Sequence, residues 1–146
     1  MSVAGITAEN AENLPDIEKQ WAVKSFHHAE TYFRLVSAVH PRRIKLTPID
    51  DEIYAAFREE FPDLVLENLR ELEDFKSEKA KAKWRNFIMK YETKVEDYNF
   101  GTLLRNRCGE DYGPNNCFFV TRFQFFCIEI ARNREGYNDV LHADKN

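Results

Sequence analysis

Apolar residues recur mostly at steps of three and four from Ala80 to Tyr98, and this spacing is the feature that most constrains the fold. It is the spacing of side chains that share one face of an α-helix. A second stripe, with steps of three, four or one, runs from Ile17 to Val39. The chain holds only 5 Gly and 5 Pro, too few turn formers for a protein built from many short strands. The pattern therefore predicts an all-α fold.

The N-terminal stripe predicts a long helix preceded by a short arm. Asn13 can cap this helix, and Leu14-Pro15-Asp16 places a proline and an acid in the first turn, where both are favourable. Pro41 marks the end, because proline does not continue a helix. Residues 1–12 are small and polar, and we expect them to form a flexible arm.

Three further helices are expected in the middle of the chain. Thr47 can accept hydrogen bonds from first-turn amides and Asp50 can reach back, as in a capping box, so a second helix should begin here. It should end at Phe61-Pro62. A third, weaker helix is expected over 64–72. Ser77 can cap the fourth, which the spacing predicts to continue to Tyr98.

The last apolar segment, 118–132, fits two structures. Its opening Phe-Phe-Val-Thr favours a strand. Read as a helix, it places on one face Phe119, Val120, Phe123, Phe126, Cys127, Ile130 and Ala131. The segment is long for a strand, and Gly136 can stop a helix, so we predict a helix. The sequence thus predicts a single compact domain of about five helices over 13–146.

Targeting and membrane signals are not visible. The N-terminal residues lack the basic and apolar regions of a secretory signal, and no apolar run approaches the roughly 18 residues that span a bilayer. The 3 cysteines, Cys108, Cys117 and Cys127, show no CxxC spacing. An odd number without metal-ligand spacing is typical of a reducing compartment. We therefore expect a cytoplasmic protein that does not bind membranes.

Charge is distributed unevenly along the chain. The net charge is −4, yet residues 50–78 alone carry 11 acidic and 3 basic side chains, a sum of −8. A solvated helix face is the common meaning of such a stretch, and steering of a basic partner is the alternative. No broad basic field of the kind that replaces phosphate counterions is present. Direct binding of nucleic acid is therefore not expected.

Residues that could carry chemistry are few, and each has a simpler explanation. Asp50-Asp51-Glu52 are first-turn acids that favour the helix dipole. His27 and His28 are adjacent on a helix and so point about 100° apart. Cys108 and Cys117 flank a loop, but a thiol nucleophile there would need a distant histidine base. No glycine-rich phosphate loop occurs. We expect neither an enzyme nor a bound metal or cofactor.

Two stretches, Val95–Arg105 and Glu129–Asp139, have the composition of a protein-recognition surface. Both combine Tyr, Asn, Gly and Arg near expected helix ends, and Tyr and Arg are enriched at interface hot spots. The predicted partner-binding residues are Tyr98, Asn99, Phe100, Arg105, Arg132, Asn133, Arg134, Tyr137, Asn138 and Asp139. The alternative is that they cap helices and seat turns, with Arg105 or Arg132 paired internally to acids.

Sequence blocks in the same regions resemble a known family. They extend in order from about Ala8 to Asp139 and cover nearly the whole chain. The blocks are Ala29-Glu30-Thr31-Tyr32, Leu46-Thr47 with Asp50 to Tyr54, Lys83-Trp84-Arg85, VEDYNFGTLLR over 95–105 and QFFCIEIARNREGY over 124–137. Together they closely resemble the eukaryotic polysaccharide biosynthesis domain-containing protein 1 family, and the last two blocks are quite specific.

The resemblance implies a dedicated chaperone. Such a protein is cytosolic and ribosome-associated, and binds the nascent GTP-binding domain of translation elongation factor 1-alpha without ATP. The family name itself points to plant xylan-modifying enzymes, but those need a nucleotide-cofactor fold for which this sequence has no motif. The competing hypothesis is an adaptor or scaffold that holds a folded cytosolic partner, and the residues alone do not separate it from a chaperone.

Overall fold

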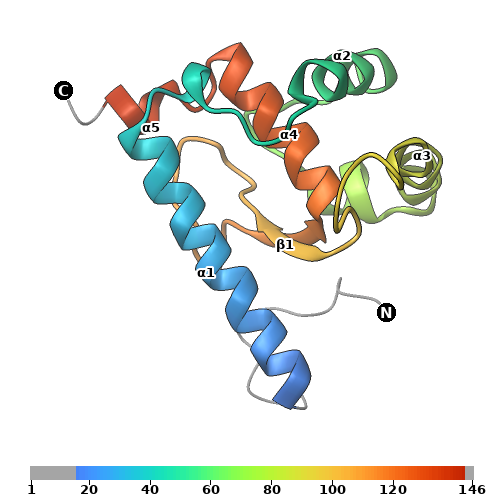
Figure 1. Cartoon of the computed structure of the whole chain (residues 1–146), viewed down its shortest axis with the longest axis horizontal. Helices are drawn as coiled ribbons and strands as arrows, with labels where there is room; N and C mark the ends of the chain where they lie inside the picture. The colour runs from blue at the N-terminus through green and yellow to red at the C-terminus, as the bar shows by residue number, and fades with distance from the viewer. Residues whose placement is uncertain (1–15, 144–146) are drawn as a thin grey trace.

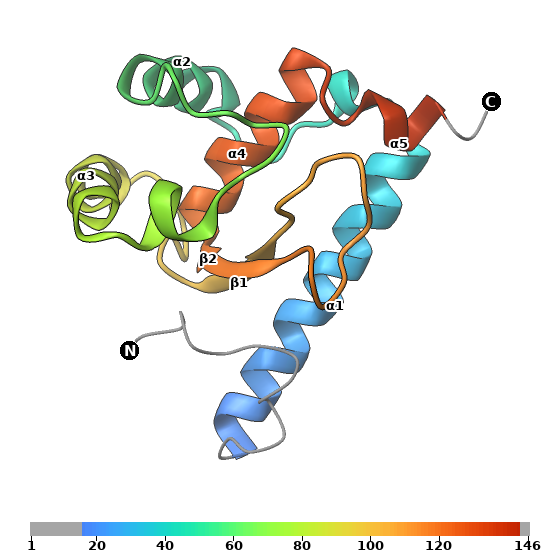
Figure 2. The ribbon, with the colours of Figure 1, turned by 180° about the vertical axis from the view of Figure 1, so that it is seen from behind.

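The computed structural model describes the backbone of residues 16–143 and the side chains of residues 23–142. The predicted arm over 1–12 and the Asn13 cap lie outside the described residues. Helix α4 crosses the middle of the molecule, with α1 on one side and α2 and α3 on the other (Figure 1). A two-stranded sheet lies at one end of α4, and the short helix α5 lies beyond its other end (Figure 2).

Helix α1, Asp16–Ala38, confirms the predicted N-terminal helix. Its inner face buries Ala29, Tyr32 and Val36, and it packs against strand β1. The side chains of the first part of the stripe, including Trp21, lie outside the described residues. The short 3-10 helix η2, Pro41–Arg43, follows α1 and buries its proline, so the chain turns where the sequence predicted.

Helix α2, Asp50–Glu60, begins three residues after Thr47, and its N-cap Ile49 forms no side-chain capping hydrogen bond, so Thr47 is not the helix cap that the sequence predicted. The other half of the predicted capping box, Asp50 reaching back to Thr47, is present. The Asp50 carboxylate accepts hydrogen bonds from the Thr47 amide at 2.7 Å and from the Thr47 hydroxyl at 2.6 Å. The Thr47 hydroxyl in turn accepts from the Ile49 amide at 3.0 Å. Ile53 and Phe57 are fully buried, which holds the apolar stripe of α2 against α4.

The helix predicted over 64–72 is wrong. Asn68 and Arg107 form an isolated antiparallel bridge, and neighbouring backbone groups bond across to the same distant segment. The backbone here is extended, and the Leu69 side chain that it carries is buried in the core. Pairing with a partner far along the chain overrides a weak helix propensity. The segment then closes with the π-helix η3, Glu71–Lys76.

Helix α3, Glu78–Ile88, is capped by Ser77 as predicted but is shorter than expected. A 3-10 turn, η4, covers Met89–Tyr91, and the chain then passes through turns to Tyr98. Asp97 has a left-handed backbone with φ of 54°. A right-handed helix cannot continue through a residue in this conformation. The apolar spacing therefore continues past the helix end because these turns pack on the same core.

The all-α prediction is wrong, because the chain also forms a sheet and the fold is α+β. Strand β1, Gly101–Leu104, pairs antiparallel with β2, Phe118–Thr121. The register places Leu103 opposite Phe119. The strand alternative is thus correct for the first four residues of segment 118–132. Aromatic and β-branched residues stabilise extended structure once a partner strand is available, and β1 supplies it.

Helix α4, Arg122–Glu135, begins where β2 ends and forms the centre of the core. Thr121 and Gln124 form a capping box at its start, and Gly136 ends it in the left-handed conformation with φ of 89°. Eleven of its residues are buried, including charged ones. Helix α5, Asp139–Ala143, follows and contacts α1.

An aromatic cluster joins α2 and α3 to the sheet. The Trp84 ring lies stacked 4.3 Å from Phe61 and 5.3 Å from Phe75, measured between ring centroids. The indole N–H donates to the Asp74 carbonyl at 2.9 Å, so this buried polar atom is satisfied. Within residues 16–143, the helices are all too short or too polar to cross a bilayer.

Candidate functional site

The ten predicted partner-binding residues lie in three places. Four are buried, namely Arg132 and Asn133 in α4 and Arg105 and Asn138 beside it. Tyr98, Asn99 and Phe100 lie at the N-terminal end of α4, where the Phe123 amide donates to the Tyr98 carbonyl at 2.9 Å. Arg134, Tyr137 and Asp139 lie at its C-terminal end. A helix of 14 residues is about 21 Å long, so the two exposed groups do not form one surface.

The buried group is organised by Glu129, which lies in the middle of α4 with no exposed surface. One carboxylate oxygen accepts from Arg105 at 2.9 Å and from Asn138 at 2.9 Å. It also accepts from the Tyr32 hydroxyl at 2.9 Å. The other oxygen accepts from Arg132 at 2.8 Å. This network, called the Glu129 network below, joins β1, α4, α1 and the chain before α5.

Electrostatics keep Glu129 ionised inside the protein. Burial alone would raise the pKa of this carboxyl group, but the charges of Arg105 and Arg132 and hydrogen bonds from Asn138 and Arg132 lower the pKa to about 2. Burial and the Glu129 charge together raise the pKa of the Tyr32 hydroxyl well above its usual value, so it stays a neutral donor. The carboxylate is satisfied on both oxygens, although the buried Arg105 Nε has no hydrogen-bond partner among the described residues. A water-excluded network of this kind positions chain segments.

The role of Arg105 and Arg132 follows from these contacts. Both pair internally with an acid, as the alternative interpretation of the sequence held. Arg132 also donates to the Leu66 and Asn106 carbonyls at 2.9 and 3.0 Å. A partner could touch these side chains only if the core opened. Partner binding therefore remains a prediction for the exposed members of the set.

The exposed group near the start of α4 borders a groove, called the Tyr98 groove below. Its volume is about 520 Å³. The floor is apolar, and Met89 lies on its edge with 60% of its surface exposed. The groove is lined by Phe75, Lys76, Lys81, Trp84, Arg85, Ile88, Met89, Glu92, Tyr98, Asn99, Val120, Thr121 and Gln124. Tyr98 and Asn99 are the two predicted residues among them.

The second exposed group borders a hollow of about 480 Å³ at the other end of α4. We call it the basic hollow, because four of the residues that line it are Arg42, Arg43, Lys45 and Arg134. Asp50, Asp51 and the apolar Pro41, Ile44 and Ile130 complete the lining. Arg134 is one of the predicted partner-binding residues, and Asp139 lies 3.6 Å from Arg42.

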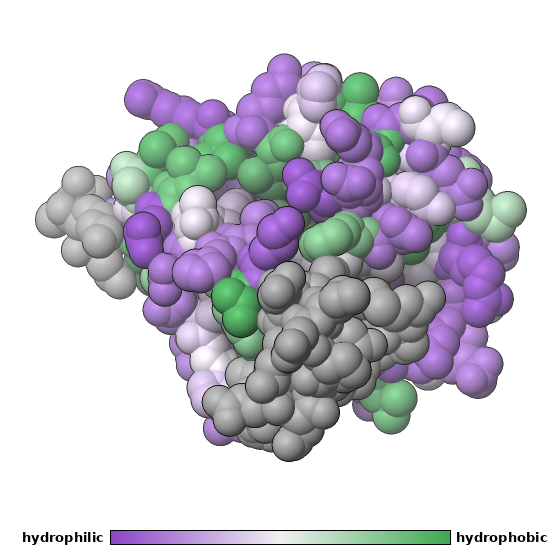
Figure 3. Space-filling view, turned by 60° about the horizontal axis from the view of Figure 1, so that its bottom comes forward, coloured by the Kyte–Doolittle hydropathy of each residue, from purple (hydrophilic) through white to green (hydrophobic). Residues whose placement is uncertain are grey.

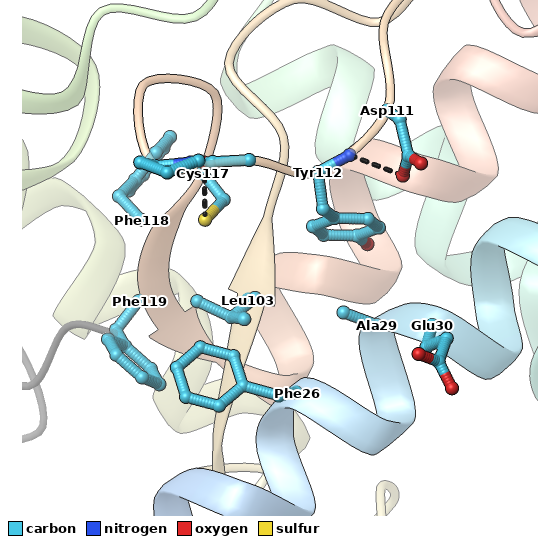
Figure 4. Close-up of a pocket in the computed structure, with 11 residues that line it drawn as sticks. Phe26, Ala29, Glu30, Leu103, Asp111, Tyr112, Cys117, Phe118 and Phe119 are labelled. Atoms are coloured by element: carbon cyan, nitrogen blue, oxygen red, sulfur yellow. Dashed lines mark hydrogen bonds between the residues drawn. The ribbon is translucent and has the colours of Figure 1, made fainter. Parts of the chain in front are cut away.

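A third depression, an apolar cleft of about 380 Å³, lies between α1 and the loop that joins the strands (Figure 4). Phe26 and Ala29 project from α1 toward Leu103 and Phe119 of the sheet, and Tyr112 closes one side. None of the ten predicted residues lines this cleft. Its walls belong to a small apolar cluster of Ala29, Leu103 and Phe119, which packs α1 on the sheet.

Groups with chemical potential do not assemble into a reactive site within the described part of the chain. No three His, Cys, Asp or Glu residues there come together as metal ligands would. His28 forms a hydrogen bond of 2.9 Å with the Thr102 hydroxyl. Thr102 is buried, so this hydroxyl does not face a substrate. Burial raises the pKa of the Cys108 and Cys117 thiols, so neither is an activated thiolate.

Comparisons with known proteins agree with this geometry. The family model of the PBDC1 protein matches residues 17–143. Protein PBDC1 of Mus musculus is 54% identical over 133 residues, and the Saccharomyces cerevisiae homologue is 46% identical over 141 residues. The chain belongs to the PBDC1 family. The resemblance recognised in the sequence is therefore confirmed.

A solved structure of a PBDC1-like chain has the same fold. The solution NMR structure of protein yst0336 from Saccharomyces cerevisiae superimposes with a TM-score of 0.81 at 45% identity. The alignment covers 97% of this chain and 99% of that one. Protein PBDC1 of Homo sapiens is 50% identical, and the match covers 94% of this chain but 58% of the human protein. For the mouse protein the covered share is 67%.

Several residues of these PBDC1 surfaces were not predicted as partner-binding. No sequence pattern marked Met89 as a binding residue, because its position on the rim of a groove depends on where α3 ends. Glu129 could have been noticed as a lone acid inside an otherwise apolar helical segment. The basic hollow had a clearer signal, since Arg42, Arg43 and Lys45 occur within four positions of the link between two helices.

Proposed function

We propose that this protein is an ATP-independent chaperone that binds the nascent GTP-binding domain of translation elongation factor 1-alpha at cytosolic ribosomes. The proposal rests on membership of the PBDC1 family and on the function that the sequence resemblance implies. It treats the protein as a binding module without catalytic activity. The word polysaccharide in the family name is treated as an inherited label.

The observation that carries the proposal is the Tyr98 groove. An unfinished GTPase domain exposes apolar segments that it will later bury, and a chaperone must cover them for a limited time. The groove offers an apolar floor beside the exposed Met89, and flexible methionine side chains adapt to varied partners. Lys76 is held at its edge by donating to the Phe119 carbonyl at 2.7 Å.

The acidic stretch 50–78 suits a basic client. Exposed acids there include Glu59, Asp63, Glu67, Glu71 and Glu73. Figure 3 shows hydrophilic residues over much of the right-hand side of the molecule, in colours that do not separate acids from bases. A field of one sign raises the rate at which an oppositely charged partner is captured. In this proposal the acids speed encounter and the Tyr98 groove holds the client.

Release must come from the client itself. The sequence has no glycine-rich phosphate loop that could use ATP. A ligand shifts an equilibrium only by its difference in affinity between two states. The bound segment therefore leaves when folding with nucleotide buries it inside the client. This predicts modest affinity for the unfolded segment and none for the mature protein.

The experiment uses ribosomes stalled after synthesis of the GTP-binding domain of elongation factor 1-alpha. The Met89→Asp variant replaces the exposed apolar side chain at the edge of the groove by a charge and should weaken capture of these complexes at least about tenfold. Val23→Asp is the matched control, because Val23 is 51% exposed and lies outside both the groove and the acidic stretch. Equal capture by both variants, with helicity retained, would overturn the placement of the client.

A further inference from the structure

The link between α1 and α2 lies across the last turns of α4 and forms the basic hollow there. Pro41 is buried, and the 3-10 turn that it begins directs Arg42 and Arg43 outward. Ile44 and the buried Ile130 form an apolar floor. The hollow lies at the opposite end of α4 from the Tyr98 groove, so the proposed client site does not use it.

The positive charges of the hollow are only partly neutralised. Arg43 and Lys45 are exposed, and neither forms an ion pair with another residue in the range 23–142. Arg42 is 60% exposed and lies 3.6 Å from Asp139, a loose pair. Arg134 binds Asp51 at 2.6 Å, but the Asp51 side chain is 95% exposed. Incoming carboxylates could replace both acids at little cost.

The third acid of the hollow does not compete for these cations. The Asp50 carboxylate is buried and accepts from the amides of Leu46 and Thr47 at 2.8 and 2.7 Å. Its hydrogen-bonding capacity is used by the start of α2. Four cations therefore face two replaceable carboxylates, those of Asp51 and Asp139.

One of the arginines, Arg134, is held in place before any partner arrives. The Arg134 guanidinium lies over the Tyr54 ring, 5.4 Å from its centroid. Such preorganisation lowers the entropy lost on binding. A neighbouring depression lined by His40, His142 and Arg43 continues the same basic face.

We propose that the basic hollow binds an acidic peptide segment of a second partner protein, one that carries an apolar residue between carboxylates. The carboxylates would bind Arg42, Arg43, Lys45 and Arg134, and the apolar side chain would cover Ile44 and Ile130. A peptide fits better than RNA, because the floor of the hollow is apolar and can be covered by an apolar side chain that lies between carboxylates.

The test measures fluorescence anisotropy of a labelled Asp/Glu-rich peptide with one central Leu, titrated with the full chain. The double variant Arg43→Glu with Lys45→Glu should weaken binding at least about tenfold. Lys79→Glu with Lys90→Glu is the matched control, because it makes the same charge change at exposed positions of α3 and η4. Circular dichroism verifies that all variants remain folded.

Three results would overturn the inference: no binding of the acidic peptide, an equal loss in both double variants, or tighter binding of a single-stranded RNA of equal length that the hollow variant abolishes. The last result would make the hollow a nucleic-acid site. Met89→Asp should leave peptide binding unchanged, so failure of this inference and failure of the proposed client site are distinguishable.

Discussion

Glu129 and Arg132 lie three residues apart on α4 and form an ion pair of 2.8 Å from which solvent is fully excluded. Arg105 reaches the same carboxylate from the end of β1 at 2.9 Å. Asn138 adds the chain that precedes α5. The network therefore fixes the end of β1, helix α1 and the chain before α5 against the middle of α4.

We expect Glu129→Gln to destabilise the protein strongly. The substitution removes the negative charge and leaves two buried guanidinium groups uncompensated. Breaking one partner of a buried ion pair costs about 3–5 kcal/mol of unfolding free energy. Urea denaturation followed by circular dichroism measures this loss directly.

The control for that substitution is Glu110→Gln. Glu110 pairs with Arg107 at 2.7 Å, but both side chains are largely exposed. Solvent screens such pairs, so little change in the denaturation midpoint is expected. A similar loss in both variants would contradict the special role of the buried network.

Stability should also depend on pH through Glu129. The pKa of this group is 4.5 in an ordinary environment and about 2 in the folded protein. Because the folded value is the lower one, the network stabilises the protein fully above pH 4.5, and this contribution is lost as the pH falls toward 2. The denaturation midpoint of the wild type should decline across this window more steeply than that of Glu129→Gln. Parallel declines would contradict the assignment.

Replacing Gly136 by alanine should destabilise the end of α4. The residue has φ of 89°, and an added Cβ atom would lie 3.2 Å from Arg42. A left-handed backbone costs a non-glycine residue about 1–2 kcal/mol. Gly113→Ala is the control, because a Cβ atom added at Gly113 would meet nothing within 4 Å. Thermal unfolding of the two variants gives the comparison, and an unchanged midpoint for Gly136→Ala would be the contrary result.

Association with the client should slow as salt is added. If the acids of stretch 50–78 steer a basic client, the on-rate should fall between about 50 and 300 mM salt, because ions screen exposed charges. Neutralising Glu59, Asp63 and Glu67 with glutamine or asparagine should reduce both the on-rate and its salt dependence. Stopped-flow mixing with the unfolded, nucleotide-free GTP-binding domain measures both. A flat on-rate would remove the steering role.

Helices with strong local signals could be predicted from the sequence. The stripe of α1 and the contact by which Asp50 reaches back to Thr47 before α2 depend on residues a few positions apart, and both formed as expected. The structure of strand β2 could not be predicted from residues a few positions apart. Phe118–Thr121 is extended because Gly101–Leu104 lies beside it, and no short-range pattern contains that pairing.

The candidate site was predictable only in part. Composition pointed to the chain around Tyr98 and around Arg134, which border the Tyr98 groove and the basic hollow. Composition could not separate exposed arginines from Arg105 and Arg132, because burial depends on how α4 sits against β1. A charged residue is buried only with partners, and its partner Glu129 lies 24 positions from Arg105.

A pulldown of the tagged protein from translating cells, with and without puromycin and with mass spectrometry of the captured proteins, tests the central claim most directly. The account predicts enrichment of elongation factor 1-alpha that falls when puromycin releases nascent chains. Enrichment of mature proteins that is insensitive to puromycin would contradict a co-translational chaperone and would indicate an adaptor instead.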